Sequence, residues 1–472
     1  MISNQIKSLL CQRQTRAATR STTTTTSTAL KCLFRRTSLQ SFSSATSPTT
    51  TDDTTFDYVV VGAGSAGCVV ANRLSKDPNN KVIVLEAGGK DDYPWIHVPL
   101  GYLYTMKHPR TSWGFNTTAQ DGLNGRSLWY PRGKVLGGCS SINGMIYQRG
   151  QRKDYDTWQE LSGSDQWGWD DMKHYFNQSL DYSEAFLAQE AGEGVHGEGT
   201  ETTPWSNLQG GEWHVEKQRL SWQVLDDFKV ACEEADIPSR VHFNSSDEEG
   251  CGYFQVNQRN GFRLSSYGAF LKPVLARSNL SVRTNVHVDR LLFDPSSAGH
   301  GSGGSGGSGG GSGGSGGHRA AGILVTNTNT GEQSTIRAKK EIVLAAGAVG
   351  SPHILQCSGI GDRDVLHGMN VPGITFDSGG SNHGGGGGGG GDGGSANTYF
   401  HLPGVGQNLQ DHLQIRSVYQ LKEGTITLNS WKKAGSLFGQ ALLGIEYVQS
   451  VFMMHVGGTC CVTFSTGNMR NI

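Results

Sequence analysis

Three glycines near the N-terminal third of the chain have the spacing needed to bind a dinucleotide. Gly62, Gly64 and Gly67 form a G-x-G-x-x-G pattern directly after the apolar run at residues 58–61. Gly62 would permit a tight turn, Gly64 would let the backbone approach a pyrophosphate, and Gly67 would let a helix pack closely on a sheet. The N–H groups at the positive end of that helix would then bind the phosphates.

A glutamate completes the pattern. Glu86 follows the apolar run at residues 82–85 and lies nineteen residues after Gly67. A carboxylate at the end of this second strand can accept hydrogen bonds from a ribose diol, which favours an adenosine ribose without a 2'-phosphate. NAD and FAD use the same turn, so these residues alone leave the choice between them open.

The elements that position these residues are a strand, a helix and a second strand, which predict an α/β fold. Farther along, residues 296–317 are almost entirely Gly and Ser, and such a run cannot bury enough apolar surface to become ordered. Strand-rich segments at 280–293 and 320–348 flank this run, so we expect an enlarged hairpin loop there. A second glycine run, residues 379–394, is also expected to be a loop.

Composition restricts the partners. The net charge of −1 gives no electrostatic field for nucleic acid or an anionic membrane, which leaves small molecules. The nine cysteines include no zinc-site spacing, so no metal is expected. The apolar stretch at residues 441–464 contains Glu446 and His455, which would be expensive inside a membrane, and we expect no transmembrane span.

Residues 1–51 are rich in Ser, Thr, Lys and Arg and contain no acidic residue. This composition is typical of a disordered organelle transit peptide. A short basic stretch at residues 11–20 could form a helix, and it favours the mitochondrion over the chloroplast.

Several ordered motifs carry a family resemblance. They are PRGKVLGGCSSINGMIYQRG at residues 131–150, GAVGSPHILQCSGIG at 347–361 and LPGVGQNLQDH at 402–412. With them the chain resembles the glucose-methanol-choline (GMC) family of FAD-dependent oxidoreductases over about residues 55–450, apart from the glycine runs. The segment YFQVNQRNG is most similar to the choline dehydrogenases of that family, and a general alcohol dehydrogenase remains an alternative.

The resemblance implies FAD as cofactor, in a Rossmann-like FAD/NAD(P)-binding domain. A discontinuous α+β substrate domain would be built on an antiparallel sheet. The FAD domain would comprise residues 55–160 and 215–365, and a partial substrate domain would comprise residues 161–214 and 366–472.

The resemblance also implies the cofactor-binding residues. The pyrophosphate would lie on the glycine turn and the ribose on Glu86, while residues 132–138 would run beside the pyrophosphate and flavin. Asn143 and Gly144 would lie near the reactive edge of the ring, and the backbone of Val288 would meet adenine. The full set is Gly62, Gly64, Ser65, Ala66, Gly67, Glu86, Arg132, Gly133, Leu136, Gly137, Gly138, Asn143, Gly144, Val288 and Gly347.

The implied reaction is oxidation of the CH–OH group of a primary, choline-like alcohol, with hydride transfer to flavin N5. The family's base is a histidine in a C-terminal segment like H-P-x-G-T-C-K-M-G, and the sequence is expected to be truncated before it. His455 begins a partial H-x-x-G-T-C match and is a candidate for this histidine, brought close by a deletion, although the missing Lys-Met-Gly favours a chance match. His412 is interpreted as structural or pocket-lining. The catalytic base is therefore unassigned.

Other functions remain open at this stage. The chain could be a truncated, inactive flavoprotein or a fragment of a gene model. It could also perform another flavin chemistry of the family, such as long-chain alcohol oxidation or fatty acid photodecarboxylation. The electron acceptor, oxygen or a respiratory carrier, is likewise open.

Overall fold

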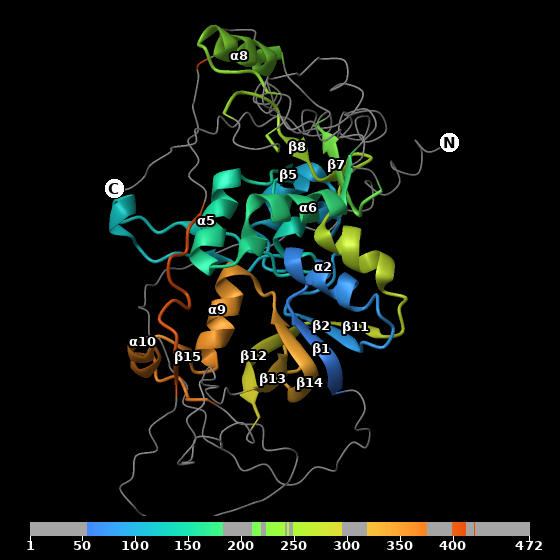
Figure 1. Cartoon of the computed structure of the whole chain (residues 1–472), viewed down its shortest axis with the longest axis vertical. Coiled ribbons are helices and arrows are strands. Elements are labelled where there is room, and N and C mark those ends of the chain that lie inside the picture. Colours follow the sequence, from blue (N-terminus) through green and yellow to red (C-terminus); the bar gives the residue numbers. More distant parts are fainter. Residues whose placement is uncertain are drawn as a thin grey trace, which may run out of the picture. The chain divides into compact units, whose positions relative to one another are not determined.

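The largest sheet of the computed structural model has six strands (Figure 1). The structure describes residues 54–182, 210–218, 223–240, 243–244, 249–294, 319–374, 399–411 and 420. The predicted transit peptide, both predicted glycine loops, the apolar stretch at 441–464, His412 and His455 lie outside these residues.

The strands of this sheet confirm the α/β fold. In spatial order they are β11 (Leu280–Thr284), β2 (Val82–Glu86), β1 (Thr55–Val61), β14 (Gln333–Leu344), β13 (Ala320–Asn327) and β12 (Val286–Phe293). The first four are parallel. Val59, Val60, Ile83 and Val84 are fully buried, as expected for central parallel strands covered on both faces.

β14 pairs with one neighbouring strand in parallel and with the other in antiparallel orientation. Its first part, up to Arg337, pairs antiparallel with β13, and its remainder pairs parallel with β1. β13 in turn pairs antiparallel with β12, so the hairpin predicted around the Gly/Ser run is present. Between β11 and β12 a single residue, Asn285, takes a left-handed conformation with φ 58°.

The carboxyl ends of the parallel strands meet at one edge of the sheet. Val61 pairs with Leu85 and with Leu344, and Glu86 pairs with Thr284. The segments that follow these strands therefore lie close together. This edge is where open α/β sheets bind ligands.

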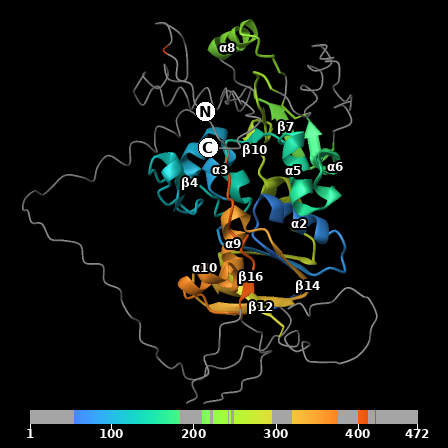
Figure 2. The ribbon, with the colours of Figure 1, turned by 60° about the vertical axis from the view of Figure 1, so that its left-hand side comes forward.

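Two helices follow parallel strands from this edge. α2 (Ser65–Leu74) comes after β1, and α9 (Gly347–Cys357) comes after β14 and packs beside β12 (Figures 1 and 2). α2 packs on a π-helix, Tyr267–Leu271, through a shared apolar cluster that includes Cys68 and Phe270.

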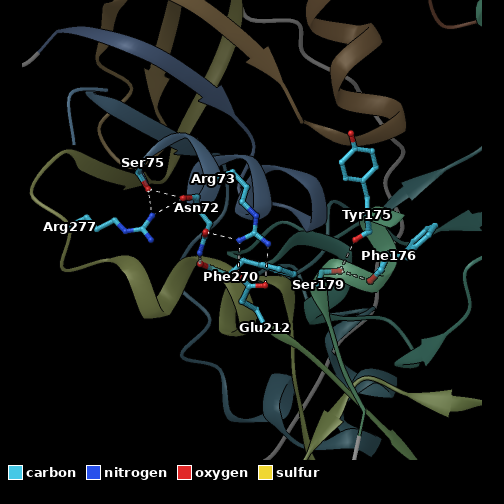
Figure 3. A network of polar contacts seen from close by, with 9 residues as sticks. All are labelled: Asn72, Arg73, Ser75, Tyr175, Phe176, Ser179, Glu212, Phe270 and Arg277. Atoms are coloured by element: carbon cyan, nitrogen blue, oxygen red, sulfur yellow. Dashed lines mark hydrogen bonds and ion pairs between the residues drawn. The ribbon is translucent and has the colours of Figure 1, made fainter. Parts of the chain in front are cut away.

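Polar contacts also fasten α2 in place (Figure 3). Asn72 Nδ2 donates to the carbonyl of Phe270 at 2.7 Å, and Arg73 pairs with Glu212 at 2.5 Å. Arg277 Nη1 donates to the carbonyl of Asn72 at 2.7 Å. These contacts tie the helix to segments about 140 to 200 residues away in sequence.

A second sheet has four strands in the order β5 (Ile146–Tyr147), β8 (Gln255–Val256), β7 (Trp213–Lys217) and β6 (Leu180–Tyr182). It is antiparallel except for β6 and β7, which are parallel. The long connection from residue 183 to 212 permits that parallel pair. This sheet takes strands from both predicted domains, and the division into domains stays a prediction.

The remaining helices have 3 to 12 residues, and the remaining strands have two residues each. None of the described helices has the length and apolar character needed to span a membrane. The other helices are α3 (Pro94–His97), η1 (Pro99–Gly101), α4 (Tyr102–Thr105), η2 (Asp121–Leu123), η3 (Gly138–Ser141), α5 (Arg152–Ser162), η4 (Asp165–Trp167), α6 (Trp169–Ser179), α8 (Gln223–Glu234), η7 (Lys272–Val274) and α10 (Arg363–Gly368), and the other strands are β3 (Phe115–Asn116), β4 (Trp129–Tyr130), β9 (Gln258–Arg259), β10 (Phe262–Arg263), β15 (Ile360–Gly361) and β16 (Phe400–His401).

Candidate cofactor site

The turn after β1 cannot be built without glycine. Gly62 has φ 95°, and a Cβ there would lie 2.6 Å from the carbonyl oxygen of Ala345. A Cβ on Gly67 would lie 1.9 Å from the carbonyl oxygen of Gly62. Both positions therefore serve the tight turn and the close packing of α2, as predicted from the sequence.

The beginning of α2 is suited to an anion. Gly64 is its N-cap and supplies no side-chain hydrogen bond, and the first turn contains no acidic residue. Ser65 and Ala66 are exposed. The first backbone N–H groups of a helix have no intrahelical acceptor, and they carry the positive end of its dipole. A pyrophosphate would accept hydrogen bonds from these N–H groups, and its negative charge would interact favourably with the helix dipole.

Gly64 is a different case from the other two glycines. Its φ is −80°, and the nearest atom to a Cβ there would be Gly138 Cα at 3.9 Å. The protein itself therefore leaves room for a side chain at this position. The absence of one keeps the backbone accessible to a ligand.

Glu86 is held rigidly beside the turn. Its Oε2 accepts the Ala63 N–H at 2.9 Å, and its Oε1 accepts the Gly88 N–H at 2.8 Å. Burial raises the pKa of the Glu86 carboxyl to about 7, against the lowering effect of those two N–H groups and of Lys134. Each carboxylate oxygen has a further lone pair, which a ribose hydroxyl could use.

Residues 133–138 pack directly on the turn. Gly137 N–H donates to the carbonyl of Ala63 at 2.7 Å, and Leu136 N–H donates to the carbonyl of Gly89 at 3.0 Å. A Cβ on Gly138 would lie 2.7 Å from Gly64 Cα. The structure thus brings together the glycine turn, the region of Glu86 and the second glycine-rich motif, although about seventy residues separate the first from the last.

Arg132 and Cys139 flank residues 133–138 in the sequence. The Arg132 guanidinium stacks 4.0 Å from the centre of the Tyr130 ring, while its Nε is buried and has no hydrogen-bond partner among the described residues. Such an orphaned donor fits a site whose ligand would complete it. The Cys139 sulfur accepts the Gly133 N–H at 3.4 Å, which indicates a packing role for the thiol.

Asn143 and Gly144 follow this motif in the chain and are exposed. Asn143 accepts two hydrogen bonds from Arg263, a residue that was not predicted from the sequence. Arg263 Nη1 donates to Asn143 Oδ1 at 2.8 Å, and Nη2 donates to the Asn143 carbonyl at 2.7 Å. Arg263 lies two residues beyond the segment YFQVNQRNG, and residue type alone does not reveal that its side chain is buried.

Two predicted residues lie farther from the turn. Val288 lies on the edge strand β12 with its side chain buried in the core cluster, which leaves only its backbone for a ligand. Asn285, three residues earlier, donates its N–H to the Gly88 carbonyl at 2.8 Å and so connects β12 to the site. Gly347 has φ 83° and is exposed at the start of α9.

A comparison with protein families decides the identity of the site. A family model described as GMC oxidoreductase matches residues 56–414. The chain belongs to the GMC oxidoreductase family. FAD is therefore its cofactor, and the residues described above fit that molecule: an uncapped helix start for the pyrophosphate and a fixed carboxylate for the ribose.

Curated relatives agree with the family. The chain is similar to "Alcohol dehydrogenase [acceptor]" of Pseudomonas putida, with 35% identity over 76% of this chain and 54% of the relative. It is also similar to "Choline dehydrogenase, mitochondrial" of Homo sapiens, with 32% identity over 83% of this chain and 55% of the relative. The chain thus spans about half the length of these relatives.

A solved structure of an FAD-dependent oxidoreductase from Chaetomium thermophilum is similar in fold. The TM-score is 0.54 at 27% identity, covering 68% of this chain and 50% of the other. The GMC resemblance, the fold class and the FAD cofactor predicted from the sequence are thereby confirmed.

Proposed function

We propose that the protein oxidises the CH–OH group of a primary alcohol, with a choline-like alcohol as substrate. The observation that carries the proposal is the junction of three segments at one sheet edge: the turn at Gly62, the carboxylate of Glu86 and the motif at Gly137. Membership in the GMC family, with curated relatives named as alcohol and choline dehydrogenases, supports this reaction class.

Different residues of the site would bind different parts of FAD. The start of α2 and residues 133–138 would bind the pyrophosphate, and Glu86 would accept hydrogen bonds from the adenosine ribose. The buried Nε–H of Arg132 would donate a hydrogen bond to the cofactor. Asn143 and Gly144 would lie near the flavin. Bound FAD supplies the chemistry by accepting a hydride from the alcohol carbon.

We also propose a mitochondrial location. The N-terminal 51 residues are basic, rich in hydroxyl side chains and free of acidic residues. The human relative carries the word mitochondrial in its name. Fractionation of cells that express the complete protein tests this, and recovery in the cytosol would contradict it.

Anaerobic reduction of the bound flavin tests the proposed reaction. The FAD-loaded protein is mixed with choline, a simple primary alcohol or tetramethylammonium, which has the cationic head but no hydroxyl group. Loss of the oxidised flavin absorption with either alcohol, and none with tetramethylammonium, is the expected result. An oxidised spectrum that no alcohol changes, in a protein that dithionite does reduce, would contradict the proposal.

A further inference from the structure

Arg263 is a buried arginine beside the proposed flavin end of the site. It is 6% exposed and makes four hydrogen bonds. Besides the two bonds to Asn143, its Nε donates to the carbonyl of Ile96 at 2.7 Å and its Nη1 donates to the carbonyl of Ser140 at 3.0 Å. Burial lowers the pKa of the guanidinium to about 9, which leaves it charged at neutral pH.

The acceptors of Arg263 are all neutral. They are three carbonyl oxygens and one amide oxygen, and no carboxylate of the described residues forms an ion pair with this side chain. A buried charge without a counter-ion is destabilising, and proteins rarely keep one without a use. The missing negative charge points to a ligand that supplies it.

The charge is fixed relative to the cofactor site. Ser140 Oγ donates to the carbonyl of Gly137 at 2.6 Å and accepts the Ser266 N–H at 2.9 Å. Ser266 Oγ donates to the carbonyl of Ser65 at 2.7 Å. Ser266, three residues after Arg263, thus connects the start of α2 to the second glycine motif, and Arg263 itself bonds Ser140 of that motif, so the guanidinium is held in a fixed position beside them.

We propose that Arg263 is a positioning residue that holds Asn143 at the flavin and that its charge raises the reduction potential of bound FAD. The inference rests on the proposed placement of Asn143 near the flavin. A hydride carries two electrons and one proton, so the ring that accepts it gains one negative charge while the alcohol proton goes to a base. A fixed cation nearby stabilises that added charge.

The reduction potential of bound FAD tests this in the full-length protein, by titration against a reference dye without any alcohol. Arg263→Met removes the charge and Arg263→Lys retains it. We expect the equilibrium constant for FAD reduction to be at least tenfold lower in the Met variant than in wild type, which corresponds to a reduction potential lower by about 30 mV for a two-electron couple. The potential of the Lys variant should change by less. Arg277→Met is the matched control, because Arg277 bonds the far end of α2, and its potential should equal that of wild type.

An Arg263→Met variant with the wild-type potential would overturn the proposal. If this variant does not retain FAD, Arg263→Lys decides, because a buried lysine loses its proton far more readily than arginine. Its potential should then fall further than that of wild type as the pH rises from about 6 to about 8, a range in which the wild-type arginine keeps its charge, and parallel curves would contradict the proposal. A protein that binds FAD but oxidises no alcohol would leave this test valid, so the two failures are distinguishable.

Discussion

At the scale of single residues, the three glycines of the turn do different work. Gly62 and Gly67 are required by the fold itself, because a Cβ at either would collide with backbone. Gly64 meets no such obstacle. A substitution at Gly64 therefore separates the binding of FAD from folding.

We expect Gly64→Ala to fold normally but to bind FAD at least about tenfold more weakly, a loss of about 1.4 kcal/mol, because the methyl group would occupy the approach of the pyrophosphate. FAD titration of the cofactor-free protein, with thermal unfolding alongside, measures both. Gly122→Ala is the control, since a Cβ there meets nothing within 4 Å and Gly122 lies outside the site. Equal FAD affinity in the two variants would contradict the role given to Gly64.

Glu86 predicts a pH dependence of FAD binding. Burial raises its pKa to about 7, and hydroxyl donors from a ribose would stabilise the ionised form and lower that pKa. A protonated Glu86 must then lose its proton on binding, so the affinity for FAD should rise as the pH rises from about 6 to about 8. Glu86→Gln should bind weakly with little pH dependence, and an unchanged pH profile in this variant would count against the ribose contact.

The sequence revealed the residues whose chemistry is encoded locally. The glycine turn and Glu86 lie within one strand–helix–strand unit, so their spacing in the sequence was enough to predict that they lie close together. Arg263 could not be predicted in this way. Its acceptors at Ile96 and Asn143 are 167 and 120 residues away, and only the folded chain shows that it is buried.

At the scale of elements, the strands were predictable and their pairing was only partly so. The runs at β1 and β2 are apolar and β-branched, and the flanks of the Gly/Ser run indicated the β12–β13 hairpin. The double pairing of β14 and the parallel pair of β6 with β7 depend on the partners brought beside them. No pattern within either strand encodes those partners.

The anchoring of α2 offers a contrast between buried and exposed polar contacts. Asn72 is 6% exposed, so Asn72→Ala would leave the Phe270 carbonyl without its donor and should lower the free energy of unfolding by about 1–3 kcal/mol. Glu212→Gln weakens an ion pair whose side chains are 41% and 34% exposed and should cost at most about 1 kcal/mol. Denaturant unfolding of both variants measures these two losses. Asn72→Ala should lose more free energy of unfolding than Glu212→Gln, and the reverse order would contradict this explanation.

At the scale of the whole molecule, one edge of the six-stranded sheet explains the site. Four parallel strands end there, and the turn after β1, the region of Glu86, Asn285 and the start of α9 follow them. The motif at residues 133–138 is then added from outside the sheet through two backbone hydrogen bonds. Family membership and this arrangement agree on FAD as the cofactor.

The most direct test is the flavin content of the purified protein and of its Gly64→Ala variant. The wild-type protein should contain one tightly bound FAD per chain, released on unfolding and identified by mass, and the variant should lose most of it while keeping its fold. A wild-type protein that neither contains FAD nor binds it when supplied would contradict the central claim. A Gly64→Ala variant that retains full FAD content would show that the cofactor does not lie on this turn.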